Sequence, residues 1–564
     1  MYLTPRARVD DYTARGWWGG TTVDDLLQRA RAETPQRIAI VDPANREALD
    51  GGAPCRLTWA QLGDEVDRAA AALLALGLAK DDILALQAPN TVDTVTLILA
   101  CARLGLIVSP APMQYREHEL AYILDQLRPA AFLTVPRFAG HDHAVLALRL
   151  REGRPGYAVI VLGEDAPAGA IAFGPAVRAA DPARAAAYHA ADPVQAGEVF
   201  TLCWTSGTEA RPKGVPRDHN HWLVSARTVT EASDLRDGEV LLNPFPMVNM
   251  AAFGIAMSWL WRRATMVLHH PFDLGVFLRQ IRDERVNYTI TAPAILNGLL
   301  KNEALLAGAD LSSLRAIGSG SAPLSPWMIQ TFKGRFGIEV ANIFGSNEGV
   351  SLCSSHLTVP DPVDRARYFP RWGVEGLEWD AATAGMVRTR LVDPATEQDV
   401  TAPGIPGELR IDGAATFSGY WQAPHLNETA FDAEGFFKTG DLFEIAGEGP
   451  TPRFYRFVGR CKEIIVRGGV NISPAEIDDL LAGWPAAKEA AVVGVPDEIL
   501  GERMCLAVVP AGAPPTLDDA KAWLSRTGLA VYKLPERLAL IDALPRNAMN
   551  KIVRAELRAK VLGG

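Results

Sequence analysis

The feature of this sequence that most constrains its fold is an alternation of amphipathic segments with short apolar runs. Apolar residues recur at helical spacing over 23–30 and again over 62–73, which predicts two amphipathic helices. Between and after them lie apolar runs at 38–41, 83–86, 106–108 and 159–162. Runs of this length favour buried strands. Strands that alternate with helices indicate crossover units, so we predict an α/β fold with largely parallel sheets covered on both faces.

The length of the chain predicts more than one domain. A chain of 564 residues exceeds what one hydrophobic core usually organises. Near the end, apolar runs at 490–495 and 504–509 and a helical pattern at 474–481 indicate a small α+β unit. We predict an N-terminal domain over 1–461 and a C-terminal domain over 462–564. The stretch 165–192, rich in Ala, Pro and Gly, is interpreted as a surface excursion between elements.

Composition argues against several classes of function. The formal net charge of −10 disfavours a nucleic-acid binder, which needs a basic face. The six cysteines form no C-x-x-C pair, so we expect reduced thiols rather than disulfides or a zinc site. The N-terminus has no apolar signal core, and the longest apolar run, 249–261, is too short to cross a bilayer. We therefore expect a cytoplasmic protein with no membrane span.

The strongest single motif is TSGTEARPKG at 205–214, which follows an apolar run at 199–204. Small hydroxylated residues and glycine expose backbone N–H groups and hydroxyls to a polyphosphate, and a lysine supplies positive charge. The spacing is not that of a Walker A loop, because no G-x-x-x-x-G-K-[ST] occurs. An ordinary Ser/Gly turn is the alternative, and the residue types favour phosphate binding over it.

This segment resembles the phosphate loop of the adenylate-forming superfamily, which includes acyl-CoA synthetases, luciferases and the adenylation domains of peptide synthetases. Segments that resemble other motifs of the family follow in order: GSGSAPL at 318–324, NIFGSNE at 342–348, TGD at 439–441, GRCKE at 459–463, RGG at 467–469 and LPR-x4-KI at 544–552. The resemblance extends from about residue 22 to residue 558. It implies a large N-terminal domain of layered, largely parallel sheets with helices, and a small mobile α+β C-terminal domain.

The resemblance also implies a role for each matched residue around ATP. The phosphates would lie on Thr205, Ser206, Gly207, Thr208 and Lys213. Glu348 would hold Mg²⁺, a cation that prefers oxygen ligands. The nucleotide would contact Ser321, Ala322, Asn342, Phe344, Gly345, Asn347, Asp441 and Arg460. Within that set, the Phe344 ring would lie against adenine, the Asn342 amide at its edge and the Asp441 carboxylate on the ribose hydroxyls.

Lys551 is the catalytic residue that the resemblance implies. Its ammonium would bridge the attacking carboxylate and the α-phosphate, where negative charge builds in the transition state. The small domain would then rotate about Lys462 for the thiol step, and Gly468 and Gly469 would leave room for a pantetheine arm. The implied reaction activates a small-molecule carboxylic acid with ATP as acyl-AMP and transfers the acyl group to CoA.

The acyl pocket is expected at Asn249, Met250, Ala251 and Gly320, and it departs from the family pattern. The family often has His at position 249, and relatives that activate hydroxybenzoates usually have Asn at 250. Other segments, including VPR at 215–217, resemble the aryl-acid branch and the cyclohexanecarboxylate ligases. Burying a polar substituent without a partner costs about 1–3 kcal/mol. These residues therefore favour a hydrophobic acid, cyclic or bulky.

Three further departures leave alternatives open. Glu209-Ala210 replaces the commoner Thr-Gly, Asn347 replaces Thr, and Asn550 replaces Gly. These changes are the only support for a catalytically silent nucleotide-binding protein, and the retained charged residues of the motifs argue against it. The sequence also leaves open whether the acceptor is CoA or the phosphopantetheine of an acyl carrier protein, and whether the enzyme is a monomer or a homodimer.

Overall fold

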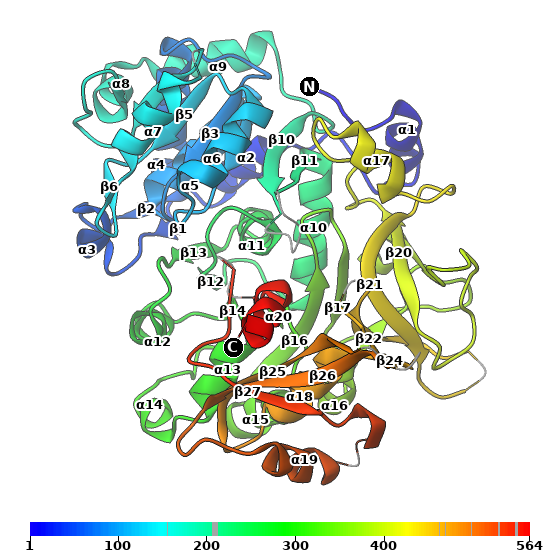
Figure 1. The fold of residues 1–564 in the computed structure, drawn as a ribbon. Helices are drawn as coiled ribbons and strands as arrows, with labels where there is room; N and C mark the ends of the chain where they lie inside the picture. The colour runs from blue at the N-terminus through cyan, green and yellow to red at the C-terminus, as the bar shows by residue number, and fades with distance from the viewer. Residues whose placement is uncertain are drawn as a thin grey trace.

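The computed structural model describes residues 1–154, 156–205, 212–449, 451–461, 463–467, 470–497, 499–527, 529, 531–547 and 551–563. Four sheets of at least five strands organise this described part of the chain (Figure 1). Two of them are large and mostly parallel, as the sequence predicts. The other two are mostly antiparallel, and the last of these is formed by C-terminal residues.

The first sheet has the order β17-β16-β15-β14-β12-β13-β1-β2 and is parallel except at its edges, where β17 and β2 run antiparallel to their neighbours. Its strands are β1 (Ile38–Val41), β2 (Arg56–Thr58), β12 (Val240–Asn243), β13 (Thr265–Leu268), β14 (Tyr288–Thr291), β15 (Ala316–Gly320), β16 (Glu339–Gly345) and β17 (Ser351–Ser354). The carboxyl ends of β15 and β16 carry two of the motifs.

The second sheet has the order β11-β10-β4-β3-β5-β8-β9, and only β11 is antiparallel to its neighbour. Its strands are β3 (Ile83–Gln87), β4 (Ile107–Pro110), β5 (Ala131–Thr134), β8 (Ala158–Val161), β9 (Ile171–Ala172), β10 (Val199–Trp204) and β11 (Gly214–Asp218). Each apolar run predicted as a strand therefore overlaps a strand, shifted by one residue at β4 and β8, and β1 and β10 have the bounds of their runs.

Helices form three layers around these two sheets, because parallel strands are apolar on both faces. The inner layer shares one core with both sheets and contains α2 (Val23–Glu33), α4 (Trp59–Ala75), α5 (Val92–Leu104), α10 (His219–Ala232) and α11 (Met250–Trp261). The outer face of the first sheet is covered by α12 (Leu274–Asp283), α13 (Pro293–Leu300) and α15 (Pro326–Thr331). The outer face of the second is covered by α6 (Glu117–Leu127) and α7 (His143–Glu152).

The expectation of an excursion between elements at 165–192 is wrong. This stretch holds β9, α8 (Phe173–Ala179) and α9 (Pro182–Ala191), and Phe173 and Ala185 are buried in the inner core. Alanine is the strongest helix former, so an Ala-rich segment forms a helix even where its apolar spacing is poor. The other helices before residue 461 are α1 (Arg6–Ala14), α3 (Arg46–Asp50), α14 (Glu303–Ala307), α16 (Pro362–Arg367) and α17 (Pro424–Ala430).

The third sheet is antiparallel, which the sequence did not lead us to predict. Its order is β18-β22-β21-β20-β19. The strands are β18 (Tyr368–Pro370), β19 (Val387–Val392), β20 (Gly407–Gly413), β21 (Phe437–Ala446) and β22 (Phe454–Arg460). It is the yellow and orange layer on the right of Figure 1, and its β21–β22 pair carries the predicted ribose-binding motif.

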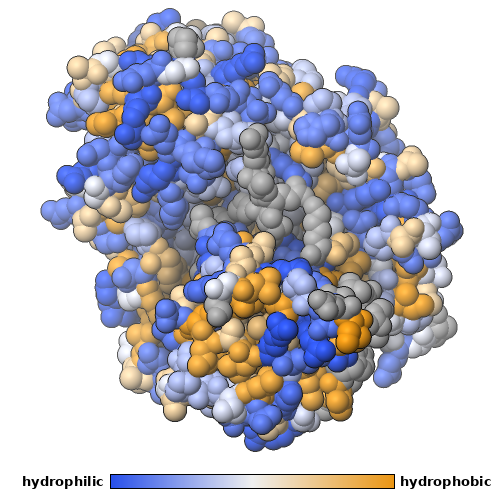
Figure 2. Space-filling view, viewed as in Figure 1, coloured by the Kyte–Doolittle hydropathy of each residue, from blue (hydrophilic) through white to orange (hydrophobic). Residues whose placement is uncertain are grey.

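The C-terminal residues have a sheet and core of their own. Strands β23 (Ile465–Arg467), β24 (Val470–Ile472), β25 (Ala487–Asp497), β26 (Gly501–Pro510) and β27 (Arg537–Leu540) pack with α18 (Pro474–Leu481), α19 (Leu517–Ser525) and α20 (Arg554–Gly563). This confirms a smaller α+β domain, while its boundary at 461/462 stays a prediction. Figure 2 shows hydrophobic residues gathered on these elements, where Leu540 and Leu562 are exposed. Among the described residues no helix is both long and apolar enough to cross a bilayer.

Candidate active site

The predicted phosphate loop connects β10 to β11, which pair as an antiparallel hairpin. Two hydrogen bonds close its base: Thr205 N donates to Lys213 O (2.9 Å), and Lys213 N donates to Thr205 Oγ1 (3.1 Å). The Lys213 ammonium lies 5.1 Å from the centre of the Tyr420 ring, a cation–π contact. The loop residues Ser206, Gly207, Thr208, Glu209, Ala210 and Arg211 lie outside the described residues.

Glu348 lies in the turn between β16 and β17, and only 9% of it is exposed. Tyr420 Oη donates a hydrogen bond of 2.9 Å to Glu348 Oε1. Among the described residues the carboxylate has no cationic partner within ion-pair distance, and its Oε2 has no hydrogen-bond donor. A largely buried carboxylate with a free oxygen suits Mg²⁺, which takes carboxylate and phosphate oxygens together. The site therefore fits the predicted metal.

Asn347, just before Glu348, connects three parts of the site. Its Nδ2 donates to Trp204 O at the end of β10 (3.1 Å), and its Oδ1 accepts from Met250 N at the start of α11 (2.9 Å). An Asn side chain has one acceptor oxygen and two N–H donors. The two hydrogen bonds use the oxygen and one N–H, so the second N–H could donate to a ligand oxygen.

Gly320 ends β15 and pairs with Ile343 of β16. A Cβ at Gly320 would lie 1.9 Å from Ile343 O, so only glycine permits this pairing. Ser321 follows with φ of 72°, and both Ser321 and Ala322 are exposed. The turn leaves them at the carboxyl edge of the first sheet, which is where open α/β sheets bind ligands.

Asn342 and Phe344 lie on β16 on the side of the antiparallel sheet. The buried Asn342 donates from Nδ2 to the carbonyls of Arg365 and Ala366, both at 3.1 Å, so Oδ1 is its remaining group for an adenine edge. The half-buried Phe344 ring meets Phe443 edge-on, with centroids 5.0 Å apart. The edge-on contact leaves a ring face for stacking, and the exposed Gly345 follows it.

Asp441 lies on β21 directly opposite Arg460 of β22. Arg460 Nε is 3.4 Å from Asp441 Oδ1, which leaves Oδ2 to accept from ribose hydroxyls. Burial raises the pKa of Asp441 to about 6, although the charges of Arg460 and Lys551 act to lower it. Gly440 N donates to Glu408 Oε1 (3.0 Å) and Asp441 N to Thr439 Oγ1 (3.1 Å), so the TGD turn is held from within the sheet.

Lys551 belongs to the C-terminal residues, yet its charge acts on this part of the N-terminal residues. Burial is the main cause that lowers the pKa of the Lys551 ammonium; Arg460 lowers it further, and Asp441 and Glu348 oppose the shift. The same ammonium lowers the pKa of Asp441. The charge of Lys551 therefore acts on Asp441, and the charges of Asp441 and Glu348 act on Lys551.

The expected acyl-pocket residues Asn249 and Met250 begin α11. Asn249 caps the helix: its Oδ1 accepts from Ala251 N (3.1 Å) and Ala252 N (3.3 Å). Met250 Sδ accepts from Arg217 Nη1 (3.3 Å). A thioether is only a weak acceptor. The buried Arg217 guanidinium therefore lies next to a pocket residue that the sequence predicts to be apolar.

Other predicted positions are not described. The hinge residue Lys462, the tunnel residues Gly468 and Gly469, and Asn550 lie outside the described residues. Their assignments stay predictions.

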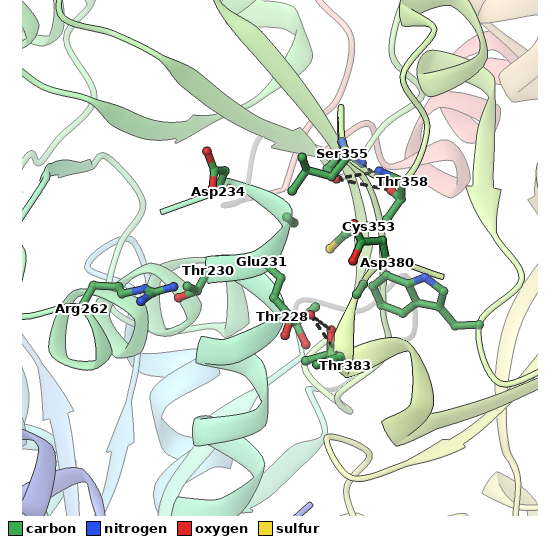
Figure 3. A pocket seen from close by; sticks show the side chains of 15 residues that line it. Thr228, Thr230, Glu231, Asp234, Arg262, Cys353, Ser355, Thr358, Asp380 and Thr383 are labelled. Carbon is green, nitrogen blue, oxygen red and sulfur yellow. Dashed lines mark hydrogen bonds between the residues drawn. The ribbon is translucent and has the colours of Figure 1, made fainter. Parts of the chain in front are cut away.

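A polar cavity of about 280 Å³ lies elsewhere, between the C-terminal end of α10 and β17 (Figure 3). Glu231, Ser355 and Thr383 help to line it. Glu231 Oε2 accepts hydrogen bonds from Thr383 N (3.0 Å) and Thr383 Oγ1 (2.7 Å). None of the predicted site residues lines this cavity, so it is separate from the cluster around Lys551.

Comparison with known proteins identifies the family. The sequence model described as "AMP-binding enzyme" matches residues 27–421, and the one described as "AMP-binding enzyme C-terminal domain" matches residues 476–551. The chain belongs to the AMP-binding enzyme family. Among the curated AMP-binding enzymes, the 2-hydroxy-7-methoxy-5-methyl-1-naphthoate–CoA ligase of Streptomyces carzinostaticus is 30% identical over 97% of this chain and 94% of its own length.

Two further similarities place this AMP-binding enzyme among adenylate-forming ligases. The salicyl-AMP ligase / salicyl-S-ArCP synthetase of Mycobacterium tuberculosis is 28% identical over 97% of this chain and 92% of its own length. The crystal structure of ATP-bound MatB from Rhodopseudomonas palustris superposes with a TM-score of 0.78 at 25% identity, covering 96% of this chain and 99% of that one. The predicted fold and family are thus confirmed.

Sequence reasoning missed two residues of this AMP-binding enzyme that touch the predicted site residues. Tyr420 joins Glu348 to Lys213, and it lies far from both in sequence. Arg217 is only 1% exposed and donates from Nη2 to Ser225 Oγ (2.7 Å). Arg217 belongs to the VPR segment at 215–217, but no sequence pattern indicated that it contacts the predicted acyl-pocket residue Met250.

Proposed function

We propose that this enzyme activates a hydrophobic cyclic or bulky carboxylic acid with ATP and transfers the acyl group to CoA. The observation that carries the proposal is the electrostatic coupling of Lys551 to Asp441 and Glu348. Lys551 is a cation of the C-terminal domain whose charge interacts with two carboxylates of the N-terminal domain. This arrangement suits a site that binds two anions, a carboxylic acid and ATP.

In the first step, the carboxylate of the acid attacks the α-phosphorus of ATP. The bond from that phosphorus to the bridging oxygen of pyrophosphate breaks, and pyrophosphate leaves. Lys551 neutralises charge that the acid and the α-phosphate share in the transition state. Lys213 and Thr205 hold the leaving phosphates, and Asp441 orients the ribose.

Glu348 would hold Mg²⁺, which neutralises phosphate charge when bound. The Tyr420 hydroxyl fixes one oxygen of Glu348 and so orients the other toward the phosphates. In the second step, a thiol attacks the acyl carbonyl, the acyl–phosphate bond breaks, AMP leaves and the thiol proton is released. Gly468 and Gly469 are proposed to pass the pantetheine arm after rotation about Lys462.

The test of this mechanism separates the two half-reactions. Lys551→Ala should lower acid-dependent ATP–pyrophosphate exchange by about 10²–10³-fold, the size typical for loss of one group that stabilises transition-state charge. Thioester formation from supplied acyl-AMP should change less than threefold, because that step does not form the charge that Lys551 neutralises. Unchanged exchange in this variant would overturn the assignment.

A carrier protein is the alternative acceptor. The similarity to a salicyl-AMP ligase that is also named a salicyl-S-ArCP synthetase supports it, and the naphthoate–CoA ligase supports CoA. Both acceptors present the same pantetheine thiol. Incubating the enzyme with ATP and benzoate, cyclohexanecarboxylate or naphthoate, and with either free CoA or a holo-carrier protein, separates them by the thioester formed.

A further inference from the structure

Backbone contacts join residues 545–547 to Lys551 and the two residues that follow it. Arg546 and Ile552 pair as a β-bridge, and Val553 N donates to Pro545 O (2.9 Å). Lys551 N donates to Asn547 Oδ1 (3.0 Å). These contacts tie Lys551, Ile552 and Val553 to residues 545–547. The same residues are attached to β25 by the Arg546–Glu489 ion pair (2.5 Å) and to its core by the packing of Ile552.

Arg554 supplies a further attachment, three positions after Lys551 and at the first position of α20. Its guanidinium makes three hydrogen bonds, each to a different element. Nε donates to Glu463 Oε2 (3.1 Å), Nη1 to Val492 O on β25 (2.7 Å) and Nη2 to Asp478 Oδ2 on α18 (2.5 Å). The side chain is 15% exposed, so solvent screens these contacts weakly.

The contact with Glu463 leads back toward the nucleotide site. Glu463 Oε1 lies 4.0 Å from Arg460 Nη1, and Arg460 in turn pairs with Asp441. Charges of alternating sign thus run from Asp441 through Arg460 and Glu463 to Arg554. In the sequence, Arg460 and Glu463 stand on either side of the predicted hinge residue, and Arg554 follows Lys551 by three positions.

We propose that Arg554 is the positioning residue for Lys551. It holds the chain just after Lys551 against Glu463 and Asp478, so that the ammonium arrives at the α-phosphate when the domains adopt this arrangement. Because only two residues separate them, a shift of Arg554 carries Lys551 with it. Small displacements of a catalytic group lower rates strongly. This inference rests on the proposed role of Lys551 in adenylation.

The competing explanation is that Arg554 only stabilises the small domain. A guanidinium that joins three elements of one domain contributes to its stability, and its removal leaves Asp478 without its cationic partner. A purely structural role predicts equal losses in both half-reactions. A positioning role predicts a loss in adenylation alone, because the thioester step does not use Lys551.

The experiment compares Arg554→Met and Arg554→Lys with Arg558→Met, a control one turn further along α20 that removes the Arg558–Glu502 ion pair (3.0 Å). For each variant, ATP–pyrophosphate exchange and thioester formation from supplied acyl-AMP are measured with the best acid of the panel above. Arg554→Met should lower exchange at least tenfold and thioester formation less than twofold. Arg554→Lys should recover part of the exchange, and Arg558→Met should change neither.

A double variant tests whether Arg554 acts through Lys551. If it does, Arg554→Met should have no further effect on exchange in the Lys551→Ala background. Additive losses, or equal losses in both half-reactions, would overturn the proposal. Should Arg554→Met fold poorly, Glu463→Gln removes one of the three attachments, and the same split between half-reactions is expected. Unchanged exchange in Lys551→Ala alone would refute the catalytic assignment itself, whatever Arg554 does.

Discussion

Asp441 is a carboxylate that the fold makes costly to ionise. Burial raises its pKa from 3.8 to about 6, so the folded state binds this proton more tightly than the unfolded chain. Its contribution to stability is therefore greatest below about pH 4 and declines as the pH rises through about 6. The proposed contact with the ribose hydroxyls would account for keeping a carboxylate that lowers the stability of the fold at neutral pH.

A pH dependence of ATP binding follows from this pKa. If Asp441 binds the ribose as proposed, only its ionised form accepts from both ribose hydroxyls, so the KM for ATP should rise as the pH falls. With a pKa of about 6, roughly one tenth of the groups are ionised at pH 5, which predicts a rise of up to about tenfold from pH 8. Steady-state kinetics in Asp441→Asn provide the reference, since ATP itself titrates in this range. An equal rise in both proteins would contradict the prediction.

Ala251 is a small residue of the expected acyl pocket, half-buried in the first turn of α11. Ala251→Trp should lower kcat/KM for a bulky acid such as naphthoate at least tenfold more than for a small aliphatic acid, because the indole occupies volume that only bulky acids need. The ratio of kcat/KM values across the acid panel measures this effect. Equal losses for all acids would exclude Ala251 from the pocket.

At the scale of elements, α11 shows why an unusual residue type stands at position 249. Asn249 is the N-cap of the helix, and its side-chain oxygen binds two of the first free N–H groups. The cap fixes where the helix begins and thus where Met250 and Ala251 lie. The departure from His thus has a local structural function beside the predicted role in the pocket.

Loss of this cap should destabilise the protein. Asn249→Ala should lower the free energy of unfolding by about 1 kcal/mol, while Asn249→Asp, which keeps a cap oxygen, should lower it by less than half of that. Urea unfolding followed by tryptophan fluorescence gives both values. Equal stability of the two variants would show that the side chain of Asn249 does not stabilise the protein through helix capping.

Local sequence patterns predicted the elements that are marked by their own apolar run or helical spacing. The apolar run that became β10 and the helical pattern that became α18 are found with the predicted bounds. The pattern failed at α9, where alanine propensity outweighed weak periodicity. The antiparallel sheet escaped prediction because its order, with β22 between β18 and β21, depends on pairings between distant segments.

At the scale of the whole molecule, the C-terminal domain meets the N-terminal domain away from Lys551 as well. Lys301 Nζ donates to Ala482 O at the C-terminal end of α18 (2.8 Å), where a cation also favours the helix dipole. Burial raises the pKa of Asp479 in α18 to about 6, and the charge of Arg367 from the N-terminal domain acts to lower it. Both interactions favour the arrangement in which Lys551 faces Asp441.

Removing the two cations Lys301 and Arg367 should therefore slow adenylation but not thioester formation. The variant Lys301→Ala/Arg367→Ala should lower ATP–pyrophosphate exchange about two- to fivefold, as expected for the loss of two partly exposed charge contacts. Thioester formation from supplied acyl-AMP should not fall, because that step uses another arrangement of the domains. A loss shared by both half-reactions would show that the contacts do not select between the arrangements.

The site could be predicted only as far as its residues stand in recognisable motifs. Asp441, Glu348 and Lys551 were predicted in this way although the sequence separates them widely, and in the structure their charges act on one another. Tyr420 and Arg554 were missed because their importance comes from partners such as Glu348 and Glu463, which lie far away in the chain. Such residues become visible only when distances are known.

The two hydrogen bonds of Asn347 have a consequence for how specificity evolves. Both reach main-chain atoms, Trp204 O and Met250 N, and every amino acid supplies the first atom, while all except proline supply the second. A substitution at position 250 therefore keeps both of these hydrogen bonds and loses only the contact of Met250 Sδ with Arg217. If position 250 lines the acyl pocket as proposed, single substitutions there can change which acid is accepted while the main-chain link from Asn347 to Trp204 and to residue 250 stays in place.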